Sequence, residues 1–264
     1  MTIRKHIQLF ALVLLSATSA VSIPAQVQTN APPAVPPPAP PKVPWKGSAA
    51  VGVTLTRGNS DTLLATASAV AGKKWAHDEL ILGADGTYGE TKDQTTGENT
   101  VNANSIHGFV QYNRLFTDRF YGYARTEALH DEVADVRYRV SLGPGAGYYF
   151  IKETNIDLCA EVGPGYVWER LGTNDSSFAT LRLGEKFHYT LNDHVRLWQT
   201  AECSPQADKF ENYVINAEIG IEADLTKKKD LTLRAFLQDT YSSEPAAGRR
   251  KNDAKLVTAI AYKF

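Results

Sequence analysis

Charged side chains occur at every second position along several stretches of this chain. Arg125 and Glu127 enclose one uncharged residue, and so do Arg137 and Arg139. In an extended strand such residues point to one face, where guanidinium and carboxylate groups can pair with one another or select passing ions. Because both signs are present, the pattern favours salt-bridge networks over an ion-selective ring. The full set comprises Arg125, Glu127, Arg137, Arg139, Glu161, Glu169, Arg182, Lys186, Arg196, Glu202, Glu218, Glu222 and Arg234.

Other reactive constellations are missing from the sequence. It has no metal-ligand spacing, Walker loop or nucleophile elbow. Two Gly-Pro-Gly segments, at 143–145 and 163–165, do not read as phosphate loops because no helix is expected after them. His107, His130 and His188 have no convincing serine partner in register, as a hydrolase would need. We therefore predict no catalytic residues, no cofactor and no metal, and a protein that is not an enzyme.

The longest alternating stretch runs from Val136 to Arg170. It reads as two strands, 136–152 and 155–170, that fold back near Thr154. Each strand carries apolar and aromatic residues on one face and charges or glycines on the other. Soluble sandwiches usually use strands of about five or six residues. Strands of this length instead favour a membrane-spanning β-barrel.

The same alternation continues from Trp45 to Phe264 and predicts about twelve strands with no amphipathic helix between them. An even number of long strands is typical of bacterial single-chain barrels. We therefore expect an all-β fold, a transmembrane antiparallel up-and-down β-barrel over residues 45–264. The alternating charges are then expected to line its narrow lumen. An open pore and a plugged barrel remain alternatives.

Two segments of different composition precede the barrel pattern. Arg4 and Lys5, an apolar run and small residues up to Ala25 have the form of a secretory signal peptide, which we assign to 1–25. Residues 26–44 are rich in proline and are expected to form a disordered, extended linker. This arm either contacts the cell wall or a partner, or acts as a plain spacer, and we favour the spacer.

Composition and the two cysteines bear on three questions: nucleic-acid binding, membrane insertion and disulfide formation. The net charge of -1 gives no reason to expect nucleic-acid binding. Twelve Tyr, ten Phe and four Trp are enough for the aromatic girdles of a membrane barrel. Cys159 and Cys203 fall on opposite faces in the predicted register, so we favour two unpaired side chains over a disulfide.

The expected turns differ between the two ends of the barrel. Compact polar turns alternate with segments expected to be longer loops, at 91–100, 171–176 and 242–252. Short periplasmic turns and longer outer loops are typical of bacterial barrels, and this asymmetry places both termini on the periplasmic side. The chain ends on an aromatic residue, and Tyr262 and Phe264 form a partial barrel-assembly signal.

Pro144 and Pro164 fall opposite each other when the hairpin is folded about Thr154. Both lack the N–H that a ladder hydrogen bond needs, and the flanking glycines leave the facing lumen unfilled. The segment is either a bend or groove in the barrel wall or a curvature device for a narrow barrel, and both interpretations stay open.

Three stretches resemble a known family. They are Trp45-Lys46-Gly47 with Thr56-Arg57-Gly58-Asn59-Ser60, then Tyr112-Asn113-Arg114-Leu115-Phe116-Thr117-Asp118-Arg119, and the Gly-Pro-Gly segments at Gly143 and Gly163. Together they are similar to the DUF481 family of unknown function, whose members are also described as salt-stress-induced, YdiY-like outer-membrane proteins. The resemblance covers roughly residues 45–264. It implies an outer-membrane barrel with a stress-related setting and supplies no catalytic residues.

These observations predict a Gram-negative outer-membrane barrel with a structural or passive, porin-like role for small solutes. An outer-membrane, phospholipase-like hydrolase and an adhesion or interaction barrel acting through its loops remain alternatives. The expected partners are outer-membrane lipid, the barrel-assembly machinery, small solutes and, through the proline-rich arm, the cell wall. No nucleic acid is expected among them.

Overall fold

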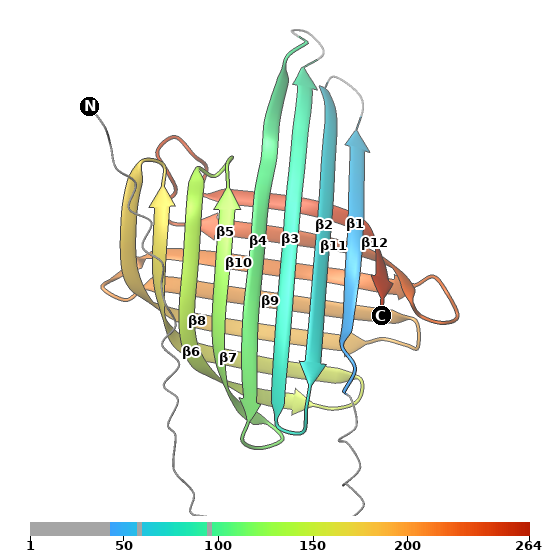
Figure 1. The fold of residues 1–264 in the computed structure, drawn as a ribbon. Helices are drawn as coiled ribbons and strands as arrows, with labels where there is room; N and C mark the ends of the chain where they lie inside the picture. The colour runs from blue at the N-terminus through green and yellow to red at the C-terminus, as the bar shows by residue number, and fades with distance from the viewer. Residues whose placement is uncertain (1–42, 57–59, 94–96) are drawn as a thin grey trace, which may run out of the picture. The chain divides into compact units, whose positions relative to one another are not determined.

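Twelve antiparallel strands close into a barrel in the computed structural model of this protein (Figure 1), which describes residues 43–56, 60–93 and 97–264. The expected signal peptide and most of the expected linker lie outside the described residues. Each strand pairs with its neighbours in sequence, and β1 pairs with β12, so the predicted up-and-down order is confirmed. The strands are β1 (Lys46–Thr56), β2 (Ser60–Lys74), β3 (Asp78–Asp93), β4 (Asn99–Leu115), β5 (Phe120–Asp131), β6 (Val136–Lys152), β7 (Ile156–Leu171), β8 (Asn174–Thr190), β9 (Val195–Gln206), β10 (Lys209–Asp224), β11 (Leu231–Ser242) and β12 (Asn252–Lys263).

The barrel has two ends, which we call the terminal rim and the far rim. The terminal rim carries the start of β1 and the end of β12, and the far rim carries the opposite strand ends. In Figure 1 strands β1–β4 cross the strands of the opposite wall steeply, as tilted barrel strands do. None of the residues that the structure describes belongs to a helix that is long and apolar enough to cross a membrane.

Two loops expected at the far rim are shorter than predicted. Only Gly172 and Thr173 join β7 to β8, because Gly172 adopts a φ of 62°, the left-handed conformation that a tight turn needs. Thr91 pairs with Thr100, so polar residues assigned to a loop instead extend β3 and β4. Polar side chains are compatible with a paired strand, and hydropathy therefore did not mark the strand ends.

The two faces of the wall have inverted polarity. Large apolar side chains are exposed on the outer face, and Glu161, Glu169 and Glu222 are buried on the inner face of the same strands. One register shift, beside Val136, turns this residue inward although the alternation placed it outside. The exposed aliphatic residues include Val51, Val53, Ile106, Val110, Val140, Leu142, Val162, Leu183, Ile219, Ile221, Leu233, Leu237, Leu256 and Ile260.

Several inward aromatic rings lie against glycines of the neighbouring strand. The cross-strand pairs are Phe109 with Gly83, Tyr121 with Gly147, Tyr123 with Gly145 and Trp198 with Gly220. A Cβ atom at Gly145 would lie 2.3 Å from the ring of Tyr123, and one at Gly147 would lie 2.2 Å from the ring of Tyr121. Glycine at these positions lets the rings lie close against the wall.

The barrel closes through a short ladder between β1 and β12. Five residue pairs join these strands, from Ser48–Lys263 to Gly52–Ala259, whereas fifteen pairs join β2 to β3. Ala261 and Ala259 are buried on the inner side of this junction, where small side chains allow close packing. The junction is the shortest ladder among the strand pairs described.

Candidate functional site: the charged lumen

Glu161 on β7 is the centre of a network that crosses the barrel interior. Its side chain is 1% exposed and accepts hydrogen bonds from Arg182 at 2.8 Å and Lys186 at 2.7 Å, both on β8. Gln111 of β4 and Tyr121 of β5 donate to the same carboxylate at 3.1 and 2.8 Å, although neither strand is a neighbour of β7. These side chains therefore meet inside the barrel, where the two cations offset the cost of burying the carboxylate.

Arg182 extends the network to β9 and to β5. Its Nη2 lies 2.7 Å from Glu202, and its Nη1 donates to the hydroxyl of Tyr123 at 3.1 Å. The guanidinium lies 5.4 Å from the centre of the Tyr123 ring, which is pressed against Gly145. The glycine, the ring and the guanidinium form one stack, and this stack fixes where the arginine stands in the lumen.

Arg125 occupies a second stack of the same kind. Its guanidinium lies 4.2 Å from the centre of the Phe109 ring, and its Nε donates to Glu127 at 2.9 Å. Glu127 also lies 3.2 Å from Nε2 of His107, whose Nδ1 is 2.9 Å from Asp85. Both ring nitrogens of His107 thus face carboxylates. This arrangement does not favour the hydrolase alternative, which needs a histidine nitrogen directed at a serine.

A second network lies near the terminal rim, around Glu222 on β10. Arg196 of β9, Arg234 of β11 and Lys263 of β12 contact its carboxylate at 2.5, 2.9 and 2.7 Å. Arg196 also pairs with Asp224. Lys263 reaches past β11 to make its contact with β10, so this network links four consecutive strands beside the closing ladder.

The remaining predicted residues are placed as follows. Arg139 pairs with Glu169 at 2.7 Å toward the far rim, and Glu218 accepts a hydrogen bond from Trp198. Arg137 differs, because its side chain is 63% exposed at the far rim. All the other residues of the predicted set are buried or half-buried.

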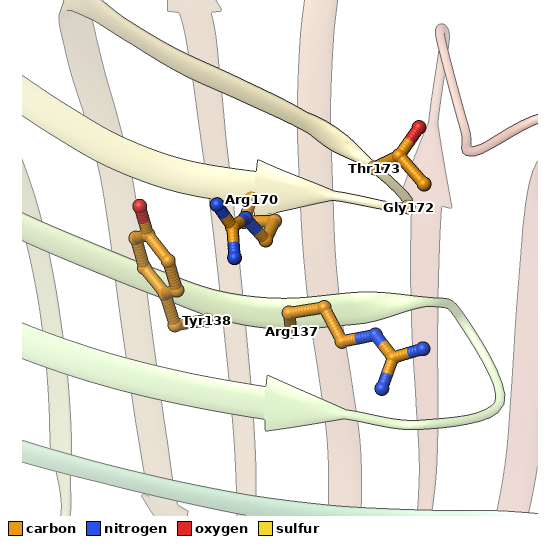
Figure 2. Close-up of a pocket in the computed structure, with 5 residues that line it drawn as sticks. All are labelled: Arg137, Tyr138, Arg170, Gly172 and Thr173. Atoms are coloured by element: carbon orange, nitrogen blue, oxygen red, sulfur yellow. The ribbon is translucent and has the colours of Figure 1, made fainter. Parts of the chain in front are cut away.

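Arg137 contributes to an open hollow between the start of β6 and the turn that joins β7 to β8 (Figure 2). The hollow is lined by Arg137, Tyr138, Arg170, Gly172 and Thr173. Arg170 and Tyr138 both bond to Asp175, and the Nε of Arg137 lies 3.5 Å from Asp135. In Figure 2 the two guanidinium groups point in different directions. They therefore do not converge on one ligand position.

Sequence reasoning missed several members of the networks, among them Gln111, Tyr121, Asp224 and Lys263. Tyr121 lies four residues before Arg125 on the same strand, so the two-residue period assigns both side chains to one face. This period could have identified Tyr121. The contact from Gln111 to Glu161 depends on how the barrel closes, and no spacing along the chain reveals it.

A small cavity lies beside the Glu161 network. Its volume is about 50 Å³, which is room for only a few water molecules. Arg125, Arg182, Glu127 and Glu202 line one side, and residues of both Gly-Pro-Gly segments line the other. The cavity is therefore small and lined largely by polar side chains and backbone.

The cysteines and possible metal ligands add no further site. Cys159 and Cys203 are both free, and they lie on opposite faces of the wall because Cys159 shares the inner face with Glu161 while Cys203 pairs with the outward Leu183. Among the residues that the structure describes, no group of three or more His, Cys, Asp or Glu side chains could hold a metal ion.

Comparison with known proteins identifies the family. The family described as "Protein of unknown function, DUF481" matches residues 49–264. The chain belongs to the DUF481 family. No curated protein matches the sequence of this DUF481 protein.

Solved structures similar to this DUF481 protein include the NanC porin, with a TM-score of 0.50, 9% identity, and coverage of 82% of this chain and 98% of that chain. The KdgM porin has a TM-score of 0.45, 8% identity and coverage of 83% and 99%. The translocator domain of the autotransporter NalP from Neisseria meningitidis has a TM-score of 0.46, 13% identity and coverage of 83% and 88%. The likeness to the NanC porin shows a shared barrel fold.

Proposed function

We propose that this DUF481 protein is an integral outer-membrane barrel with a porin-like role, in which small solutes cross passively through a narrow polar lumen. The inverted polarity of the wall carries this proposal. Leu142 and Ile219 are exposed on the outer face, whereas Glu161 is buried and Arg182 half-buried inside. A soluble barrel that carries an apolar ligand would have the opposite arrangement, and a bilayer is the solvent that suits this one.

The distribution of exposed aromatic residues supports insertion in a bilayer. Near the terminal rim these residues are Trp45, Trp75, Tyr112, Phe116, Phe120, Tyr148, Phe150, Tyr262 and Phe264, and toward the far rim they are Tyr88, Tyr138, Tyr166, Trp168 and Phe210. Lys73 lies over the rings of Trp45 and Trp75 at 5.8 and 5.2 Å. Two aromatic girdles around an aliphatic band are typical of outer-membrane barrels.

The lumen supports passage of small polar solutes with little preference for either charge. Arg125 and Arg182 face Glu127, Glu161 and Glu202 at one level, so neither sign dominates there. A ring of one sign would select ions strongly, and a mixed ring selects weakly. The small cavity volume at this level limits the size of the solute rather than its charge.

The expected route to the membrane belongs to the same proposal. A signal peptide at 1–25 would export the chain, and the barrel-assembly machinery would recognise the outward Tyr262 and Phe264, both exposed at the terminal rim. Both termini are then periplasmic. Residues 26–44 would act as a spacer or reach the cell wall, and the stress-related setting stays a prediction.

Single-channel conductance of the refolded mature protein in a planar bilayer tests the proposal. We expect small discrete steps with weak ion preference, and larger steps for Arg182→Ala, which removes a side chain from the level of the small cavity. Arg170→Ala changes an outward arginine and serves as the matched control, with unchanged steps. A folded barrel, identified by heat-modifiable mobility on a gel, that gives no steps in any form would contradict a pore and leave a plugged scaffold.

A further inference from the structure

Halfway along their length, β6 and β7 are not joined to each other by backbone hydrogen bonds. No ladder pair joins residues 143–145 to residues 163–165, although pairs flank this gap on both sides and place Pro144 opposite Pro164. The β5–β6 ladder is complete across Pro144, and the β7–β8 ladder is complete across Pro164. Because each residue of an antiparallel ladder directs its N–H to only one neighbour, both missing N–H groups belong to this gap. We call residues 143–145 and 163–165 the proline seam.

Glycines allow the two backbones of the proline seam to touch directly. A Cβ atom at Gly143 would lie 2.4 Å from the carbonyl oxygen of Pro164, and one at Gly163 would lie 2.2 Å from that of Pro144. The contacts that remain are of the weak Cα–H···O kind. Parting the seam therefore breaks no N–H···O bond, unlike parting any fully paired stretch of the wall.

The proline seam separates the polar cavity from the bilayer side of the wall. Gly143, Pro144, Pro164 and Gly165 line the cavity together with Arg125, Arg182, Ser141, Ser204 and Thr180. On the outer side the seam is flanked by Leu142 and Val162, which are 53% and 48% exposed. On the inner face of the seam, the polar cavity is covered only by backbone atoms and the hydrogen atoms of the glycines.

We propose that the proline seam is a lateral port for a single-chain anionic amphiphile. Its head would enter the cavity. Arg125 donates to Glu127 and Gln111, and Arg182 donates to Glu161, Glu202 and Tyr123, so one N–H on each Nη atom of Arg125 and one on Nη2 of Arg182 are left for the head. Its acyl chain would pass between the glycines and pack outside against Leu142 and Val162. This inference depends on the membrane location proposed above, but not on conduction along the barrel axis.

Photo-crosslinking with a long-chain carboxylate that carries a diazirine near its head tests the port. The full mature protein is refolded into vesicles containing this probe, and adducts are mapped by mass spectrometry. We expect adducts on the inward Tyr123 and Val167 as well as on outward residues. In the double variant Pro144→Ala with Pro164→Ala, two restored N–H donors favour the closed seam, and inward adducts should fall about tenfold. Pro245→Ala, which changes a proline between β11 and β12 at the far rim, should leave them unchanged.

A reversible staple gives an independent test in a Cys159→Ser, Cys203→Ser background. Cysteines replacing the paired Leu142 and Tyr166 can form a disulfide that holds the seam shut. We expect oxidation to abolish inward adducts and reduction to restore them, while a staple at the paired Ile219 and Leu237 has no effect. Inward adducts that persist in the stapled barrel, or that never form on a folded barrel, overturn the port. Conductance is recorded on the same samples, so a loss of axial conduction is distinguished from a loss of the port.

Discussion

At the scale of single residues, the stability of the barrel interior depends on a few charged side chains that are covered by protein atoms. Glu161 is the clearest case, because its carboxylate is fully covered and has partners on three other strands. A buried ion pair adds little over an apolar replacement, but removing one partner leaves an uncompensated charge and is strongly destabilising. The cost therefore depends on which member of the network is changed.

We predict that Glu161→Gln destabilises the barrel by about 3 kcal/mol, because Arg182 and Lys186 lose their shared counter-charge in a buried setting. Urea unfolding of the protein refolded in vesicles measures this difference. Glu244→Gln makes the same chemical change on a side chain that is 49% exposed and pairs with Lys209, and its effect should be small. Equal costs at the two positions would mean that Glu161 is solvated.

A second prediction concerns the glycines beneath the aromatic rings. Gly145→Ala should cost about 1–3 kcal/mol, because the added methyl group must push the ring of Tyr123 away from the wall. Gly72→Ala is the matched control, since a Cβ atom there has its nearest contact at 3.7 Å. Thermal unfolding with a fluorescence probe compares the two variants, and a similar loss in both would point to backbone effects alone.

At the scale of strands, one residue of offset decides whether a side chain meets lipid or lumen. Ile219 and Asn216 lie three residues apart on β10 and so point to opposite faces. Ile219→Arg should cost about 2–4 kcal/mol near the bilayer midplane, and Asn216→Arg much less, because it faces the polar side. Refolding yield and urea midpoint in vesicles measure both. Equal costs would contradict the register of β10.

The sequence allowed the strands to be predicted because alternation is a local property. The hairpin of β6 and β7 was identified with its facing prolines, and that register is confirmed by the pairs around Pro144. Strand ends at Thr91 and Thr100 were missed, because polar residues continue a paired strand as readily as a loop. The contacts of Glu161 with Gln111 and Tyr121 depend on closure of the whole barrel, and local patterns do not contain that information.

At the scale of the whole molecule, the closing ladder is the shortest of the described strand pairings. Five pairs hold β1 to β12, and fifteen hold β2 to β3. Local opening begins where few interactions must break. We predict that amides of Ser48–Gly52 exchange hydrogen faster than those of β3, as measured by mass spectrometry on the barrel in lipid nanodiscs. Uniform protection around the barrel would show that the Glu222 network and the alanine packing make up for the short ladder.

The stacks of glycine and ring also have an evolutionary consequence. Neither Tyr123 nor Gly145 can change size alone, since a larger residue at 145 displaces the ring and a smaller residue at 123 leaves an empty patch of wall. Arg182 then loses the surface on which it rests. Substitutions at these positions should therefore be inherited together. Across related sequences, a lost glycine at 145 should coincide with a lost aromatic at 123, and this coupled loss would identify barrels with a rebuilt lumen.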